Sequence, residues 1–168
     1  VLNLLETLGG LRAGEERHRQ VLAQALEELR HLDRSELCGG RGKAAFDTCG
    51  AHVRALFDAA RKASNEKDAN GALWLAGRLP MLDEDAQTLQ DELRRAWDQQ
   101  KMSSALGAAS LMLGDLERTV REPEELMDVL DMAEFHARQS GCDAAPQVEA
   151  VLQRLRPHVY PVLMRLLR

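Results

Sequence analysis

The chain has 168 residues, of which 45% are apolar, 29% charged and 4% aromatic, and its net charge is −5. A chain of this length suits one domain, and its balance of apolar and charged residues excludes a disordered polypeptide. A chain with a net negative charge does not have the basic surface that is typical of general nucleic-acid-binding proteins, so we expect no nucleic-acid partner. Because leucine, alanine, arginine and glutamate dominate and aromatic residues are few, the composition predicts an all-α fold.

Three cysteines stand at positions 38, 49 and 142, an odd number at irregular spacing. This pattern indicates no disulfide framework, so we expect a reducing, intracellular and by default cytoplasmic setting. The sequence begins at Val1, with no initiator methionine and no signal-peptide pattern. We therefore expect it to be a fragment of a longer chain.

Apolar residues spaced three and four apart predict the helices of the N-terminal half. The expected ranges are 1–8, 15–32, about 43–65 and 72–79. We expect a loop at 38–42, which is rich in glycine, and a turn at 68–71, where Asn70 and Gly71 accept a positive φ. The third helix should turn one set of residues inward, namely Phe46, Cys49, Val53, Leu56, Phe57 and Ala60.

The next segment starts with a capping residue, because Asp83 is a good N-cap for a helix over 84–100. We favour a break after this helix, with Ser103 as the next N-cap. An unbroken helix over 84–121 would span roughly 57 Å at ~1.5 Å per residue, which is long for one small domain. The sequence leaves open whether 84–121 is one helix or two.

Proline and glycine bound the last two predicted helices. Pro123 suits a first helical position, and Gly141 suits the residue just past a helix end. The final helix should begin near Pro146. Because Pro157 and Pro161 interrupt its apolar spacing, we expect a kink or two shorter helices there.

The segment Met102–Gly114 carries no charged residue. Its small residues share one helical face at spacings of four, three and four, namely Ser103, Gly107, Ser110 and Gly114. A helix that lacks charge all round is typical of a bundle centre. We therefore predict a single domain over 1–168, built as a bundle of six to seven helices around a buried helix at about 104–121. The closest neighbour along Gly107 should be the run 148–155.

The best candidate metal cluster consists of His31, Cys38, Cys49 and His52. Two thiolates and two imidazoles suffice for tetrahedral zinc, and Cys49-x2-His52 could chelate the ion from one helical turn. The spacing matches no standard zinc module, however, and Cys38 lies beside a glycine-rich segment. We expect these residues to be structural and no cofactor to be bound, with zinc as the alternative.

Other reactive groups are scattered. Two Glu-x-x-His units, at 15–18 and 28–31, match the unit of di-iron bundles. They share one helix at positions about 220° apart around its axis, so they cannot converge on one metal pair. Cys142 has His136 as its nearest histidine, but the sequence supplies no third group to orient that ring. We therefore nominate no catalytic residue.

Charge is unevenly distributed in the C-terminal half. Residues 115–134 hold eight acids and two arginines, whereas 150–168 hold four arginines and no acid. The two segments either complement each other or are solvated separately, or the basic one docks an acidic partner. Because 152–168 is also amphipathic, it packs into the core or presents a surface to a partner, and a membrane is the least favoured target. The candidate partner-binding residues are Arg154, Arg156, Tyr160, Arg165 and Gly107.

These observations favour a non-enzymatic protein-interaction module of the adaptor or regulatory kind. The expected partner is another protein, which would place an amphipathic helix in a groove of the bundle. A homo-oligomer formed through the small-residue face around Gly107 is a further option. The alternative from a different class is a small-molecule-binding or zinc-binding helical domain. An enzyme belongs to this alternative.

Overall fold

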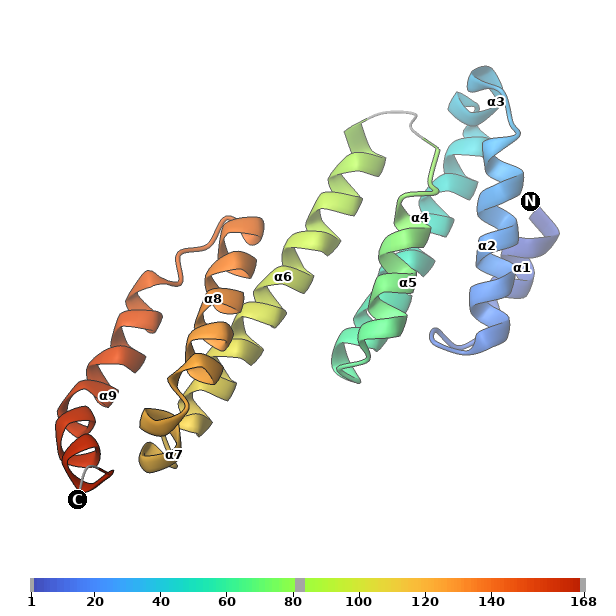
Figure 1. The fold of residues 1–168 in the computed structure, drawn as a ribbon. Helices are drawn as coiled ribbons and strands as arrows, with labels where there is room; N and C mark the ends of the chain where they lie inside the picture. The colour runs from blue at the N-terminus through green and yellow to red at the C-terminus, as the bar shows by residue number, and fades with distance from the viewer. Residues whose placement is uncertain (1, 81–83, 167–168) are drawn as a thin grey trace. The chain divides into compact units, whose positions relative to one another are not determined.

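The computed structural model describes residues 2–80 and 84–166, which form nine helices and no strand (Figure 1). The predicted all-α class is confirmed. In chain order the helices are α1 Leu2–Gly9, α2 Glu16–Arg30, α3 Arg34–Cys38, α4 Gly40–Lys62, α5 Glu66–Ala76, α6 Glu84–Met112, α7 Leu116–Arg121, α8 Pro123–Ser140 and α9 Ala145–Leu166. Two short helices, α3 and α7, account for the difference from the six to seven predicted.

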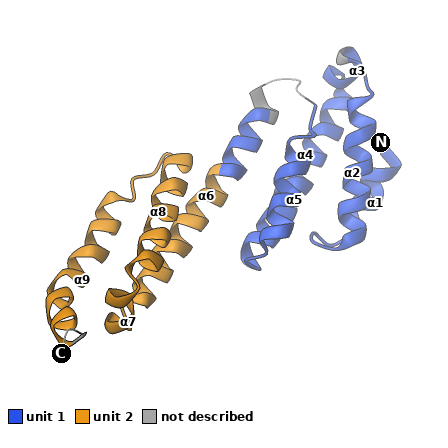
Figure 2. Cartoon of the chain, in the orientation of Figure 1, with its two compact units in different colours: residues 1–94 blue, residues 95–168 orange. Residues whose placement is uncertain are grey.

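The chain divides into two compact units, residues 1–94 and residues 95–168 (Figure 2). The boundary falls inside α6, so the first turns of that helix belong to unit 1 and the rest to unit 2. Each unit has its own buried side chains and is described by itself. The expectation of a single domain stays a prediction.

Unit 1 is organised around α4, which packs against α1, α2, α3 and α5. The inward face predicted for this helix is confirmed, because all six of its residues are buried. On α2 the same spacing of three and four buries one stripe, consisting of Leu22, Ala25, Leu26 and Leu29. Complete burial of a side chain as large as that of Phe57 contributes about 1.5–3 kcal/mol.

The predicted loop at 38–42 is wrong, because α3 reaches Cys38 and α4 begins at Gly40. A capping box starts α3: the Asp33 carboxylate accepts a hydrogen bond from the Glu36 backbone N–H at 2.8 Å. Gly42 is needed for packing, since a Cβ there would lie 2.7 Å from Leu37 Cα. The glycines of this segment therefore allow two helices to meet closely, a contact that local sequence does not reveal.

The predicted turn at 68–71 is also wrong, because α5 runs through these residues. Asn65 caps this helix by accepting a hydrogen bond from the Asp68 backbone N–H at 3.2 Å. Asp68 then lies in the first turn, where the helix dipole favours an acid, and forms an ion pair with Arg19 of α2. An early cap thus extends the predicted short helix toward its N-terminus.

In unit 2, α6 continues without interruption to Met112, so the predicted break before Ser103 is wrong. The helix ends nine residues after Ser103, and the Asp115 carboxylate caps α7 by accepting from the Arg118 backbone N–H at 3.2 Å. The predicted cap Asp83 lies outside the described residues. One core cluster joins α6, α8 and α9 and consists of Ala109, Leu113, Leu126, Leu130, Ala137, Ala144, Val148 and Val151.

Met102–Gly114 is not buried all round, which corrects its predicted place at the bundle centre. The buried residues are Ala105, Ala109 and Leu113, whereas the small-residue face is exposed. A Cβ added at Gly107 would meet nothing within 4 Å, so no neighbour packs closely along it. The run 148–155 contributes to the same core cluster as Ala109, on the other side of α6 from Gly107.

The predicted boundaries of α8 are confirmed by its backbone. Pro123 is its first residue, and Gly141 follows its end with a left-handed φ of 73°. The Asp143 carboxylate then accepts from the Ala145 backbone N–H at 2.9 Å at the start of α9. That last helix is continuous and holds Pro157 and Pro161 in its interior, so of the two expected outcomes the division into two shorter helices is wrong, and the kink stays a prediction.

Candidate partner-binding surface

The packing of α8 decides which of its residues face solvent. Leu126, Leu130, Ala133 and Ala137 are buried at spacings of four, three and four. The residues that point away from this buried stripe are mostly exposed. They include Met127, Met132 and Phe135, whose exposed fractions are 47%, 53% and 57%.

Acids alternate with these apolar side chains. Asp128 lies four residues before Met132, and Asp131 lies four residues before Phe135, so each acid adjoins an apolar neighbour on the helix surface. With an exposed glutamate one turn earlier, they form a continuous surface. We call it the α8 outer face, and it consists of Glu124, Met127, Asp128, Asp131, Met132 and Phe135.

The three acids of the α8 outer face lack a cationic partner within the described part of the chain. Their neighbours on the same helix are paired: Glu134 bonds Arg138 at 2.9 Å, and Glu125 bonds Arg118 at 2.9 Å. The α8 outer face therefore presents apolar area together with uncompensated negative charge.

All four partner-binding candidates predicted on α9 are exposed, and Tyr160 is 72% exposed. The opposite side of α9 is buried through Val148, Val151 and Val162, so the helix serves both packing and surface. Leu163 and Met164, at 43% and 41% exposure, join the same surface and were missed in the sequence. The exposed residues of α9 span a wide arc of the helix, because Arg154 and Arg156, like Leu163 and Arg165, are two residues apart and do not face the same way. We call this whole arc the α9 outer face, and it consists of Arg154, Arg156, Tyr160, Leu163, Met164 and Arg165.

The fifth candidate, Gly107, is exposed on α6. Ser110, on the same face, donates its hydroxyl to the Leu106 carbonyl at 2.9 Å, which satisfies it within its own helix. The binding role of the five candidates stays a prediction.

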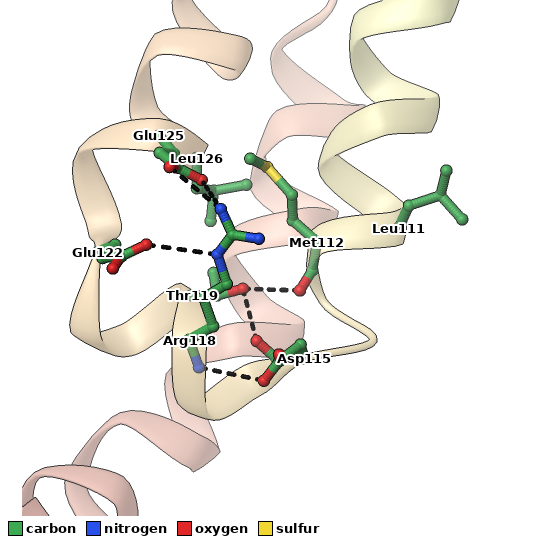
Figure 3. A pocket seen from close by; sticks show the side chains of 8 residues that line it. All are labelled: Leu111, Met112, Asp115, Arg118, Thr119, Glu122, Glu125 and Leu126. Atoms are coloured by element: carbon green, nitrogen blue, oxygen red, sulfur yellow. Dashed lines mark hydrogen bonds and ion pairs between the residues drawn. The ribbon is translucent and has the colours of Figure 1, made fainter.

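A pocket of about 290 Å³ lies where the end of α6, the helix α7 and the start of α8 meet (Figure 3). The Arg118 guanidinium lies between two carboxylates, with Nε donating to Glu122 at 3.3 Å and Nη2 donating to Glu125 at 2.9 Å. The hydrogen bond with Glu122 and the charge of Glu125 raise the pKa of Arg118. The Thr119 hydroxyl donates a hydrogen bond to the Met112 carbonyl oxygen at 2.6 Å and so joins α7 to the end of α6. These polar groups satisfy one another and hold the α6–α8 corner together.

A histidine–carboxylate pair lies in unit 2 between α6 and α8. His136 Nδ1 and Asp98 Oδ1 are 2.9 Å apart, and both side chains are largely buried. Asp98 is the orienting group that sequence reasoning did not find, because 38 residues separate the partners. The thiol of Cys142 accepts a hydrogen bond from Gln99 at 3.5 Å rather than from His136. The pair therefore joins two helices without activating that thiol.

The predicted zinc ligands are dispersed. His31 is exposed and lies 3.6 Å from Glu27, and Cys38 is exposed as a free thiol. Cys49 is fully buried, which raises its pKa to about 11 and disfavours the thiolate that zinc requires. Over residues 2–80 and 84–166, no three His, Cys, Asp or Glu side chains gather where they could hold a metal. Zinc binding stays a prediction without support from the geometry.

His52 instead contacts His18 of α2, with 3.1 Å between its Nδ1 and His18 Nε2. His18 is fully buried, and its own Nδ1 has no hydrogen-bond partner. Burial lowers the pKa of both rings, and the charge of His52 lowers that of His18 further. Two neutral rings can share one N–H between these nitrogens, whereas two imidazolium rings would repel each other.

Comparison with protein-family models, with curated proteins and with solved structures finds no match. Within the described residues, no helix combines the length and apolar character needed to cross a bilayer. The two outer faces of unit 2 are therefore the features from which a function can be argued.

Proposed function

We propose that this protein is a non-enzymatic helical module of the adaptor or regulatory kind. On this proposal, the α8 outer face binds a basic amphipathic helix of a second polypeptide chain. The observation that carries the proposal is the combination, on one exposed helix face, of large apolar side chains with acids that have no cationic partner in the described chain.

The apolar side chains supply the driving force. Complete burial of a methionine or phenylalanine side chain contributes about 1.5–3 kcal/mol. Met127, Met132 and Phe135 are each about half exposed, so covering them would contribute on the order of 1 kcal/mol each. A helix that presents apolar residues at spacings of three and four can cover such a surface.

The acids supply the choice of partner. Asp128 and Asp131 lie among the apolar side chains, so an acidic helix placed there would meet like charges without compensation. Lysines or arginines flanking the apolar stripe of a partner would pair with them. Because these charges are exposed, the attraction should weaken as salt concentration rises.

The proposal can be tested with a synthetic helical peptide of leucine and arginine as the probe. We expect fluorescence anisotropy to show saturable binding at low salt. The double variant Asp128→Lys/Asp131→Lys should weaken binding about tenfold, since each exposed charge contributes up to about 1 kcal/mol.

Matched controls separate this surface from general charge. Asp58→Lys/Asp91→Lys changes two exposed acids of unit 1 by the same amount and should leave affinity near that of the wild type. Leu111→Ser removes an 81% exposed side chain elsewhere and should have less effect than Phe135→Ser. Equal losses in the variants of both units would contradict binding at the α8 outer face.

A further inference from the structure

We propose that the helix bound by the α8 outer face is α9 of a second copy of this chain. The inference rests on the proposed function and names the partner. It assigns one interface to two surfaces, the α8 outer face of one copy and the α9 outer face of the other.

The two surfaces match in length and pattern. Glu124 to Phe135 and Arg154 to Arg165 each cover eleven residue steps, or about 17 Å of helix at ~1.5 Å per residue. On α9, Tyr160 and Met164 are four residues apart and therefore adjacent on the helix surface. Each surface thus offers an apolar strip that the other can cover.

Their charges are opposite and equal in number. The α8 outer face holds three acids, Glu124, Asp128 and Asp131, and the α9 outer face holds three arginines. None of these six side chains has an ion pair within the described part of the chain, whereas Arg118, Arg121 and Arg138 of the same unit do. Arg154 and Arg156 lie on opposite edges of the α9 outer face and flank Tyr160 and Met164, so pairing the two surfaces would bring the acids of α8 to arginines on both edges.

The match cannot be made inside one chain as it is folded. Phe135 and Tyr160 are 57% and 72% exposed, so neither outer face covers the other. Both belong to unit 2, whose core holds the buried sides of α8 and α9. A second copy supplies both missing surfaces without any change in this packing.

The contact joins α8 of one copy to α9 of the other, so it is isologous if it forms twice about a two-fold axis and heterologous if it forms once between successive copies. Either two such contacts close a symmetric dimer, or repetition of the contact gives longer assemblies. In both cases the assembly should dissociate as salt concentration rises, because the charges lie on exposed surfaces.

Charge exchange tests the interface in the whole chain by sedimentation equilibrium at low salt. The wild type should exceed the monomer mass of 18.7 kDa as concentration rises. The variants Asp128→Arg/Asp131→Arg and Arg154→Glu/Arg156→Glu should each remain monomeric, because each then presents like charges on both faces. Mixed one to one, they should associate again, since the reversed α8 of one meets the reversed α9 of the other.

The control Asp58→Arg/Asp91→Arg should associate like the wild type, and circular dichroism should show unchanged helix content in every variant. The neutral versions Asp128→Asn/Asp131→Asn and Arg154→Gln/Arg156→Gln replace any variant that fails to fold and should weaken association less.

Association that persists in both reversed variants, or a mixture that stays monomeric, would overturn the inference. A monomeric wild type whose α8 outer face still binds the basic peptide would also overturn it and would leave the proposed function standing. A wild-type chain that does not bind the basic peptide at the α8 outer face would contradict the proposed function itself.

Discussion

Units 1 and 2 treat their large apolar side chains differently. Among the described residues of unit 1, the exposed large apolar side chains are those of Leu2 and Trp74. The Arg78 guanidinium lies over the Trp74 ring, 4.6 Å from its centroid. All other exposed large apolar side chains among the described residues belong to unit 2, and most of these lie on the two outer faces. The described part of unit 1 therefore buries most of its large apolar side chains, whereas unit 2 leaves more of them exposed.

Charged residues show the same contrast. Unit 1 has local ion pairs, but it also has ion pairs between segments distant in sequence, as between Arg19 and Asp68 and between Arg78 and Glu27. In unit 2, apart from the Asp98–His136 pair, the ion pairs connect residues within a few turns of each other. Some of the charge in unit 1 thus links distant segments, whereas the acids of the α8 outer face and the arginines of the α9 outer face have no ion pair within the described residues.

The largest test of this contrast compares two phenylalanines. Phe57 of unit 1 is fully buried, so Phe57→Ala should lower the free energy of unfolding by about 3–5 kcal/mol. Phe135 of unit 2 is exposed, so Phe135→Ala should change it by no more than about 0.5 kcal/mol. Urea unfolding followed by circular dichroism measures both. Equal losses of stability would show that Phe135 is packed and would remove it from the α8 outer face.

A second test concerns pH and unit 1. The pKa values of His18 and His52 are lower in the folded chain than the ordinary 6.5, chiefly because of burial, with Arg19 lowering and Glu15 raising that of His18. Below about pH 6.5 the unfolded chain therefore binds more protons, and stability falls as pH falls toward the folded pKa values. Hydrogen exchange should show amides of α2 and α4 less protected at about pH 5.5 than at about pH 7.5.

The variant His52→Gln keeps a hydrogen-bonding side chain but cannot titrate, so it should reduce this pH dependence. His158→Gln, on the exposed side of α9, serves as the control and should leave it unchanged. A pH dependence that is the same in all three proteins would show that the histidine pair does not report on the stability of unit 1.

Local signals explain what could be predicted from the sequence. The buried face of α4 followed from apolar spacing, and the ends of α8 followed from Pro123 and Gly141, because these features act within a few residues. The pairs His18–His52 and Asp98–His136 join residues 34 and 38 positions apart, so they depend on how helices pack.

The sites were predicted less well for two physical reasons. Gly42 looked like loop chemistry, yet its role is to let α3 and α4 approach closely. Met102–Gly114 looked central because it lacks charge, but alanine, serine and glycine offer little apolar area to bury, so lack of charge did not produce burial. A different signal was available on α8, where Met127, Met132 and Phe135 depart from the spacing of the buried residues.

The smallest expected effect sharpens which surface of unit 2 is used for contact. Gly107 is exposed in the interior of α6, and a Cβ there meets nothing within 4 Å. Gly107→Leu should therefore stabilise the helix by up to about 1 kcal/mol through higher helix propensity. Light scattering should give the same mass as the wild type, because the proposed interface lies on α8 and α9. A lower mass with intact helix content would instead place the small-residue face of α6 in the contact between copies. The contact surface of unit 2 would then include α6 in addition to α8 and α9.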